Sequence, residues 1–160
     1  MQRTILPLIA GIIIGMILTG VLIWNTMPKM MITIHESKLD FESTVQSVQD
    51  AALNNGWKVP KIYNIQKSLA AAGHTEMTRL KILSICQPDA AYSILSDDDS
   101  KMVSAIMPCR MAVYVTKDST VHIASMNIGM MSKMFGGNIA STMKGVADAE
   151  AEMIADIIKE

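Results

Sequence analysis

Cysteine, histidine and aromatic side chains are all scarce in this chain of 160 residues, which has 2 Cys, 3 His, 2 Trp, 3 Tyr and 2 Phe. No histidine lies three or four residues from another histidine or from a cysteine, so the local spacing of a zinc site is lacking. A C-x-x-C-H motif is also lacking, which excludes covalent c-type haem. Neither a glycine-rich phosphate loop nor a G-x-S-x-G element occurs, so nucleotide binding and serine hydrolase chemistry have no support.

The sequence also lacks a surplus of charge of either sign, because 14 basic and 15 acidic residues give a net charge of −1. Without a basic stripe there is no electrostatic support for nucleic-acid binding. The helical spacing of some acids predicts solvated surfaces rather than a catalytic pair; these are Asp40, Glu42, Asp148, Glu150 and Glu152. The composition therefore favours a binding protein over an enzyme.

One long hydrophobic run stands at the start of the chain, from Ile5 to Trp24, and it contains no charged residue. A helix needs about 20 apolar residues to cross the hydrocarbon core of a bilayer. The run is longer than the apolar part of a cleaved signal peptide, and no small-x-small cleavage site follows it. We therefore expect an uncleaved transmembrane signal anchor at 5–26, a cytoplasmic tail at 1–4, and a juxtamembrane segment with the first strand at 27–36.

The flanking charges give the orientation of this anchor. Arg3 and the terminal amine precede the run, whereas Lys29 is the nearest cation after it. The positive-inside rule then places the N-terminus in the cytoplasm. We expect a single-pass protein of the inner, cytoplasmic membrane whose domain lies on the periplasmic side.

The anchor carries small residues at a helical interval. Gly11, Gly15 and Thr19 are each four residues apart and share one face of a helix. Such a small-xxx-small pattern allows two membrane helices to approach closely, although glycine is also common in membrane helices that do not pair. The pattern is compatible with a homodimer.

The domain at 30–160 has the pattern of an α+β fold, a mainly antiparallel sheet with helices on one face. Strands are expected at 31–35, 57–65, 79–86, 109–116 and 121–126. Helices are expected at 37–56, 66–73 and 88–96 and over most of 127–160, with 97–101 as a solvated loop. Pro60 predicts an edge or bulged strand, and Ser37 is the expected cap of the first of these helices.

The last two strands form a predicted hairpin around 117–120. If this is a four-residue turn, Val115 pairs with His122 and Met111 pairs with Met126. His122 would then lie about 20 Å along the strand from Cys109, too far for a catalytic dyad. Arg110 would point to the opposite face from Cys109 and would not activate its sulfur.

The stretch 84–115, "SICQPDAAYSILSDDDSKMVSAIMPCRMAVYV", is similar to the core of the domain-of-unknown-function family 302. The matching features are a strand that ends in Cys86, the segment "QPDAAYSIL" and the Pro-Cys-Arg element at 108–110 that runs into a hairpin. The helix before "NNGWKV" also resembles the family's first helix. The resemblance covers roughly 30–134 and implies a compact α+β domain that tends to form homodimers, with no established reaction.

Cys109 has three possible roles at this point. It is a buried thiol that acts as a small apolar residue, half of a disulfide with Cys86, or a ligand or nucleophile. Methionine is abundant, at 15 residues, and a soft-ligand pocket for copper or haem iron would consist of Cys109, Met107, Met111 and Met126. The alternative is that these methionines only fill a core or an adaptable interface.

Two functions follow from these patterns. The first is a non-catalytic, membrane-anchored accessory or binding domain, either a homodimer or a subunit of a membrane complex. Its contacts would involve the anchor face and the methionines of a helix near 126–134, namely Met130, Met131 and Met134. The second is a redox or ligand-binding protein that holds a soft metal or haem at Cys109.

Overall fold

The computed structural model describes the backbone of residues 2–159 and the side chains of residues 11–159. The chain divides into two compact units, with the division between Met31 and Ile32. The first unit is the helix α1, Gln2–Met30. Its segment Gly11–Met30 is 20 residues long with a mean hydropathy of 1.6, and is apolar and long enough to cross a membrane. The expected helix over 5–26 is confirmed for the backbone, whereas the side chains of 5–10 lie outside the described residues.

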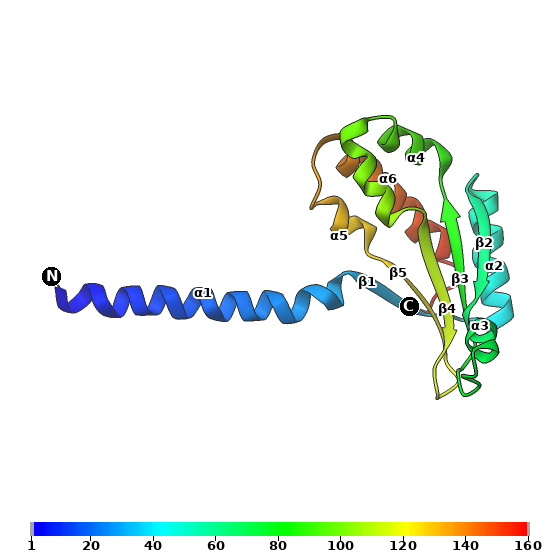
Figure 1. Ribbon diagram of the computed structural model, residues 1–160, viewed down its shortest axis with the longest axis horizontal. Coiled ribbons are helices and arrows are strands. Elements are labelled where there is room, and N and C mark those ends of the chain that lie inside the picture. The colour runs from blue at the N-terminus through cyan, green and yellow to red at the C-terminus, as the bar shows by residue number, and fades with distance from the viewer. Residues whose placement is uncertain (1, 160) are drawn as a thin grey trace. The chain divides into compact units, whose positions relative to one another are not determined.

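The second unit is α+β, as the sequence predicts (Figure 1). Its strands are β1 Ile32–Glu36, β2 Lys58–Asn64, β3 Leu80–Cys86, β4 Cys109–Val115 and β5 Val121–Met126. Its helices are α2 Phe41–Asn54, α3 Ile65–Ala71, α4 Pro88–Leu95, the 3-10 helix η1 Asp98–Ile106, α5 Ile128–Ser132 and α6 Gly137–Ile154. The five strands form one sheet in the order β1-β5-β4-β3-β2, and every neighbouring pair is antiparallel.

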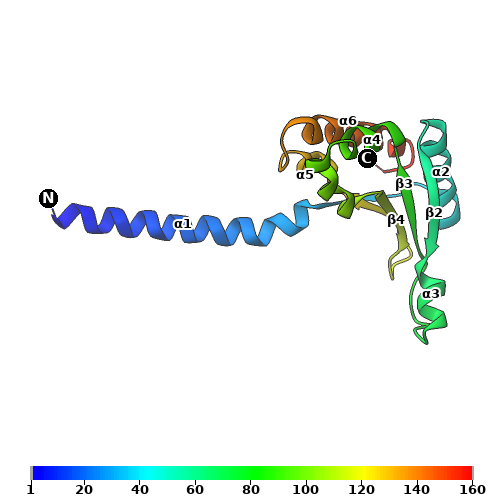
Figure 2. The ribbon, with the colours of Figure 1, turned by 45° about the horizontal axis from the view of Figure 1, so that its top comes forward.

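One face of this sheet is covered and the other is more open. The covered face presents Leu83, Ile85, Met111, Val113 and Ile123, each at most 1% exposed. They pack against apolar residues of α2 and α6, which lie beside one another over the sheet (Figures 1 and 2). The expectation of helices on one face is therefore confirmed for these two helices.

The helix α2 begins later than the sequence suggests. Asp40, not Ser37, caps it: the Asp40 carboxylate accepts hydrogen bonds from the backbone N–H groups of Glu42 and Ser43 at 3.0 and 3.1 Å. Ser37 is buried and its hydroxyl lies 2.7 Å from that of Thr44. An aspartate satisfies the free N–H groups of a first helical turn as well as a serine does, which is why the capping signal is ambiguous by one turn.

Pro60 interrupts β2 as predicted, and a glycine marks the turn that precedes β2. The register of β2 against β3 shifts between Lys58 and Lys61, on either side of Pro60, and β2 is an edge strand. Proline has no N–H to donate, so the ladder is interrupted there. Gly56 follows α2 with a φ of +76°, a conformation that residues with a side chain rarely adopt.

The β4–β5 hairpin has a different register from the predicted one. Tyr114, not Val115, pairs with His122, and Met111 pairs with Ser125 instead of Met126. The loop has three residues because the N–H of Thr116 donates to the carbonyl of Thr120 at 3.0 Å. Ser119 takes up the left-handed conformation, at φ 69°, that a three-residue hairpin loop needs.

Two other segments also differ from the sequence prediction. The expected solvated loop at 97–101 instead leads into η1, in which Asp97 accepts from the N–H of Asp99. The expected methionine helix near 126–134 is the short α5, and β5 extends to Met126. The helical region expected over most of 127–160 is interrupted at the Gly136–Gly137 pair, and α6 begins at Gly137.

Candidate binding site

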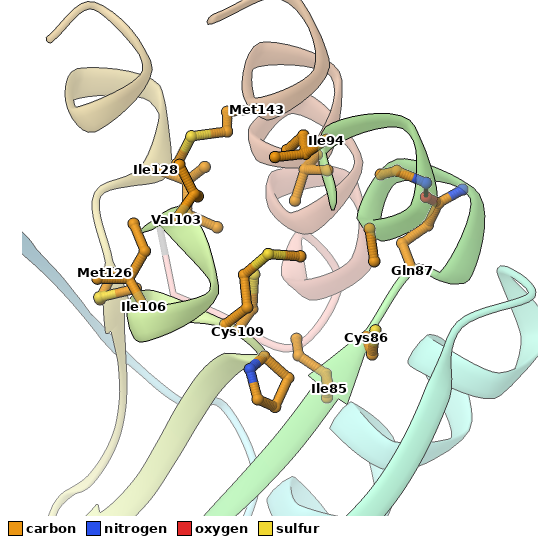
Figure 3. A pocket seen from close by; sticks show the side chains of 15 residues that line it. Ile85, Cys86, Gln87, Ile94, Val103, Ile106, Cys109, Met126, Ile128 and Met143 are labelled. Carbon is orange, nitrogen blue, oxygen red and sulfur yellow. Dashed lines mark hydrogen bonds between the residues drawn. The ribbon is translucent and has the colours of Figure 1, made fainter. Parts of the chain in front are cut away.

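An apolar cavity of about 40 Å³ lies where two hydrophobic clusters meet. The first cluster joins the covered sheet face to α2 and α6, and the second joins α4, η1, α5 and α6. Cys109 and Val146 pack against both clusters. Cys109, at the first position of β4, therefore lies beside this cavity rather than inside a continuous core (Figure 3).

Sulfur atoms from separate parts of the chain line this cavity. Cys86 ends β3, Met107 precedes β4, Cys109 begins β4, Met126 ends β5 and Met143 belongs to α6. Figure 3 shows Cys86, Cys109, Met126 and Met143 around the same space. The remaining lining is almost entirely apolar and includes Ile85, Ile94, Val103, Ile106 and Ile128.

Three of the four residues of the predicted soft-ligand pocket are brought together here, namely Cys109, Met107 and Met126. Met111 is not among them. It is 0% exposed in the main core, two residues further along β4, and does not line the cavity. The expected Met111–Met126 pair is wrong because the hairpin loop has one residue fewer than a four-residue turn.

Met143 and Cys86 complete the sulfur lining, and the sequence pattern assigns neither of them to the pocket. Met143 lies with Val146 on the side of α6 that packs inward, and the helical spacing of the two residues predicts this side from the sequence. Cys86 enters the sequence prediction only as a disulfide partner. The sequence cannot place either beside Cys109, because their proximity depends on how α6 and β3 pack in three dimensions.

Both cysteines are free thiols in the structure. Burial raises the pKa of the Cys109 thiol to about 12, and the charges of Glu150 and Cys86 add to this rise. Burial also raises the pKa of Cys86. Because the thiolate is the nucleophile, a thiol with a raised pKa is poorly suited to nucleophilic catalysis at neutral pH. Arg110 pairs with Ser84 on the other sheet face, as expected, and does not offset this effect.

His122 is also separated from Cys109, as predicted: it pairs with Tyr114, five residues along β4 from Cys109, and it lies on the other sheet face as well. Its register places it on the open sheet face, where its ring stacks on Tyr114 at 5.4 Å between centroids. Its Nε2 lies 2.9 Å from the Thr120 hydroxyl. His122 therefore packs at the hairpin and does not line the cavity.

The methionines predicted as a contact surface are divided by the structure. Met134 is 61% exposed, but Met131 is 8% exposed and belongs to the second cluster. Met130 is intermediate. Met131 packs inward within this chain because its side of α5 faces α6, and a contact surface for a partner stays a prediction.

One acid differs from the prediction of a solvated face. Glu150 on α6 is only 6% exposed. It lines a second cleft, which adjoins the sulfur-lined cavity at Met126 and Ile128.

Comparisons with known proteins agree with the fold. No significant match was found among curated proteins. The crystal structure of an uncharacterised conserved protein DUF302 from Bacillus stearothermophilus is similar, with a TM-score of 0.71 at 18% identity over 79% of this chain and 98% of that chain. At this identity the likeness concerns the fold alone. The family model for the domain of unknown function DUF302 matches residues 33–160, and the chain therefore belongs to the DUF302 family.

Proposed function

We propose that this chain is a membrane-anchored binding domain that holds a Cu(I) ion in the cavity beside Cys109. The observation that carries the proposal is the gathering of two thiols and three thioethers around one apolar cavity. Soft thiolate and thioether ligands favour Cu(I) over harder ions. The proposal does not include a catalysed reaction.

Charge balance favours a monovalent ion. When Cu(I) binds Cys109, the S–H bond breaks, an S–Cu bond forms and the proton leaves to solvent, with no change in oxidation state. One thiolate and one Cu(I) have no net charge, and the thioethers of Met107, Met126 and Met143 are neutral. An apolar lining tolerates such a neutral site, whereas an uncompensated charge there would be costly.

The size of the cavity decides between the two soft-ligand cofactors that the sequence suggests. At about 40 Å³ it has room for an ion and one or two small ligands. Cofactor and drug-sized ligand pockets are typically about 300–1,000 Å³. A porphyrin does not fit this cavity, so copper rather than haem is the proposed occupant.

Competition with a chromophoric Cu(I) chelator tests the site, using the full chain in detergent under anaerobic, reducing conditions. We expect one equivalent of Cu(I) per chain and the release of about one proton per ion. Cys109→Ser should weaken binding at least 100-fold, and Met126→Leu by roughly tenfold, since each removes one soft ligand. Met111→Leu is the matched control, because Met111 does not line the cavity.

Failure of the wild-type chain to take copper from the chelator would overturn the proposal. Equal losses in Cys109→Ser and Met111→Leu would overturn it as well when circular dichroism shows both variants to be folded, since the loss would then not depend on a residue that lines the cavity.

The location of the domain is a further part of the proposal: α1 spans the membrane and residues 32–160 lie on the extracytoplasmic side. The apolar helical segment Gly11–Met30 supports the span, and Arg3, which precedes the uncharged run Ile5–Trp24, supports the orientation. Reporter fusions after Glu160 that are active only outside the cytoplasm test it. Activity of a cytoplasm-specific reporter at this position would contradict it.

Self-association through α1 is proposed as the route to a homodimer. Apart from α1's own backbone and the neighbouring residues, a Cβ added at Gly11 or at Gly15 would meet nothing within 4 Å, as is also true at Gly20, so the small-residue spacing rather than openness singles out this face. Energy transfer between labelled chains in vesicles tests this, and a Gly11→Leu/Gly15→Leu variant should lose at least tenfold in association. Gly20→Leu is the control, because at 100° per residue Gly20 points about 140° away from Gly15. Equal losses of association in both variants would contradict pairing through the face that carries Gly11 and Gly15.

A further inference from the structure

A second cleft, of about 190 Å³, lies between the edge of the sheet and α6, and it differs in chemistry from the sulfur-lined cavity. β1 contributes Thr33 and His35, and β5 contributes Ser125. Thr33 and Ser125 are cross-strand partners on the covered face, and their hydroxyl oxygens are 3.1 Å apart. From the other side, α6 contributes Glu150.

Glu150 is a buried carboxyl group without a basic partner. Its side chain is 6% exposed, and among the described side chains of residues 11–159 no Lys or Arg forms an ion pair with it. A hydrogen bond from the Ser125 hydroxyl partly compensates for the burial. Asp148, the other acid lining the cleft, is already paired with Lys144 at 2.7 Å. Buried carboxylates normally have a cation or several donors beside them, whereas this carboxyl has the Ser125 hydroxyl as donor and no ion pair with a described Lys or Arg.

The other residues that line the cleft indicate which kind of cation it suits. Its other walls include Met126, Ile128, Ala147, Ala151 and Ile154, which offer contact to a hydrocarbon chain. Within the described part of the chain no three His, Cys, Asp or Glu side chains lie together to hold a metal ion. The lining therefore suits a cation that is polar at one end and apolar at the other.

We propose that this cleft binds a small alkylammonium compound, whose ammonium group donates hydrogen bonds to Glu150 and to the hydroxyl of Thr33 or Ser125. The alkyl part lies against the apolar wall formed by α6 and the start of α5. A charge-assisted hydrogen bond to the carboxylate supplies the cation that Glu150 lacks. This proposal does not rest on copper binding, although Met126 and Ile128 line both the cleft and the sulfur-lined cavity.

The pH dependence follows from the same geometry. The raised pKa of Glu150, about 6, means that its carboxylate forms as the pH rises through this value. A primary amine with a pKa near that of lysine, about 10.4, stays charged over this range. Affinity should therefore rise between about pH 5 and pH 7 and then level off. His35 from β1 and Asp148 from α6 are the other titratable side chains that line the cleft, and β5 and α5 contribute none.

The experiment uses the full chain in detergent, with n-propylammonium as the probe and 1-propanol as its neutral counterpart. Amide shifts of Ser125, Gly129 and Ala151 report binding by NMR. At pH 8 we expect n-propylammonium to bind at least tenfold more tightly than 1-propanol. Glu150→Gln should abolish this preference, while Glu152→Gln, an exposed acid on the same helix, should retain it.

A second variant keeps the test decisive if Glu150→Gln does not fold. Ala151 is exposed at the mouth of the cleft, so Ala151→Leu fills the space without disturbing the core. It should weaken n-propylammonium binding at least tenfold. Equal binding of the amine and the alcohol, or full binding in Ala151→Leu, would overturn the proposal.

Discussion

At the scale of single residues, the burial of Glu150 has a consequence for stability that is separate from any ligand. Burial raises its pKa from 4.5 to about 6, so the folded state holds a proton more tightly than the unfolded chain does. Its contribution to stability is therefore greatest below about pH 4.5 and is lost as the pH rises through 6. A shift of this size corresponds to about 2 kcal/mol.

Replacing Glu150 by Gln removes this titration and should stabilise the protein at high pH. We expect the free energy of unfolding at pH 8 to rise by about 1–2 kcal/mol, with little change at pH 4. Chemical denaturation of both proteins at the two pH values measures it. Glu152→Gln should leave the pH profile unchanged, and a lower stability of Glu150→Gln at pH 8 would contradict the argument.

Met111 and the exposed methionine Met134 should also differ in how much they contribute to stability. Met111 is fully buried in the main core, so Met111→Ala should lower the free energy of unfolding by about 2–5 kcal/mol. Met134 is 61% exposed, and Met134→Ala should change it by less than about 0.5 kcal/mol. Urea denaturation measures both. Similar losses in the two variants would mean that the covered sheet face is less well packed than its burial indicates.

The burial of single residues is only partly predictable from the sequence. Glu150 lies four residues after Val146 and four before Ile154, on the same stripe of α6, so the helical period indicates its burial. Its charge indicates the opposite, a solvated position. In contrast, no periodicity relates Cys109 to Met143, because the two meet only when α6 packs over the start of β4.

At the scale of elements, strands and helices are predictable from period and breaker residues, and the hairpin register is not. Pro60 and Gly56 interrupt the chain for local steric reasons, which a sequence shows directly. The loop after β4 has Ser119 at its left-handed position, where glycine or asparagine is the usual signal. Without that signal the predicted loop is one residue too long, and every pair in the hairpin shifts with it.

The left-handed conformation of Ser119 predicts the effect of substitutions in this loop. Ser119→Gly should raise the free energy of unfolding by about 0.5–1 kcal/mol, because glycine adopts a positive φ without the steric cost of a side chain. Lys117→Gly, at a loop position without a positive φ, should lower it by a similar amount through chain entropy. Thermal unfolding compares the two, and a destabilised Ser119→Gly would contradict the three-residue loop.

At the scale of the whole molecule, the two units on either side of Met31 differ in where their apolar side chains lie. The hydrophobic residues of the two clusters all lie between Phe41 and Ile158, and none of the described side chains of α1, at residues 11–30, belongs to them. The apolar surface of α1 is exposed instead, with Ile12, Ile17 and Leu22 each more than half exposed. Such a surface suits a bilayer, whereas the clusters of the second unit suffice for a core in water.

Removal of residues 1–31 should therefore make the protein soluble without detergent and leave the fold of the domain unchanged. We expect residues 32–160 to be recovered without detergent and to melt within about 2 °C of the full chain in mild detergent.

Replacing Ile13 and Ile17 by lysine in the full chain should release it from the membrane fraction, since charges are costly at the centre of a bilayer. Sedimentation after alkaline carbonate washing, with circular dichroism of the released protein, measures both effects. A truncated chain that unfolds, or a lysine variant that stays in the membrane, would mean that α1 supports the domain rather than anchoring it.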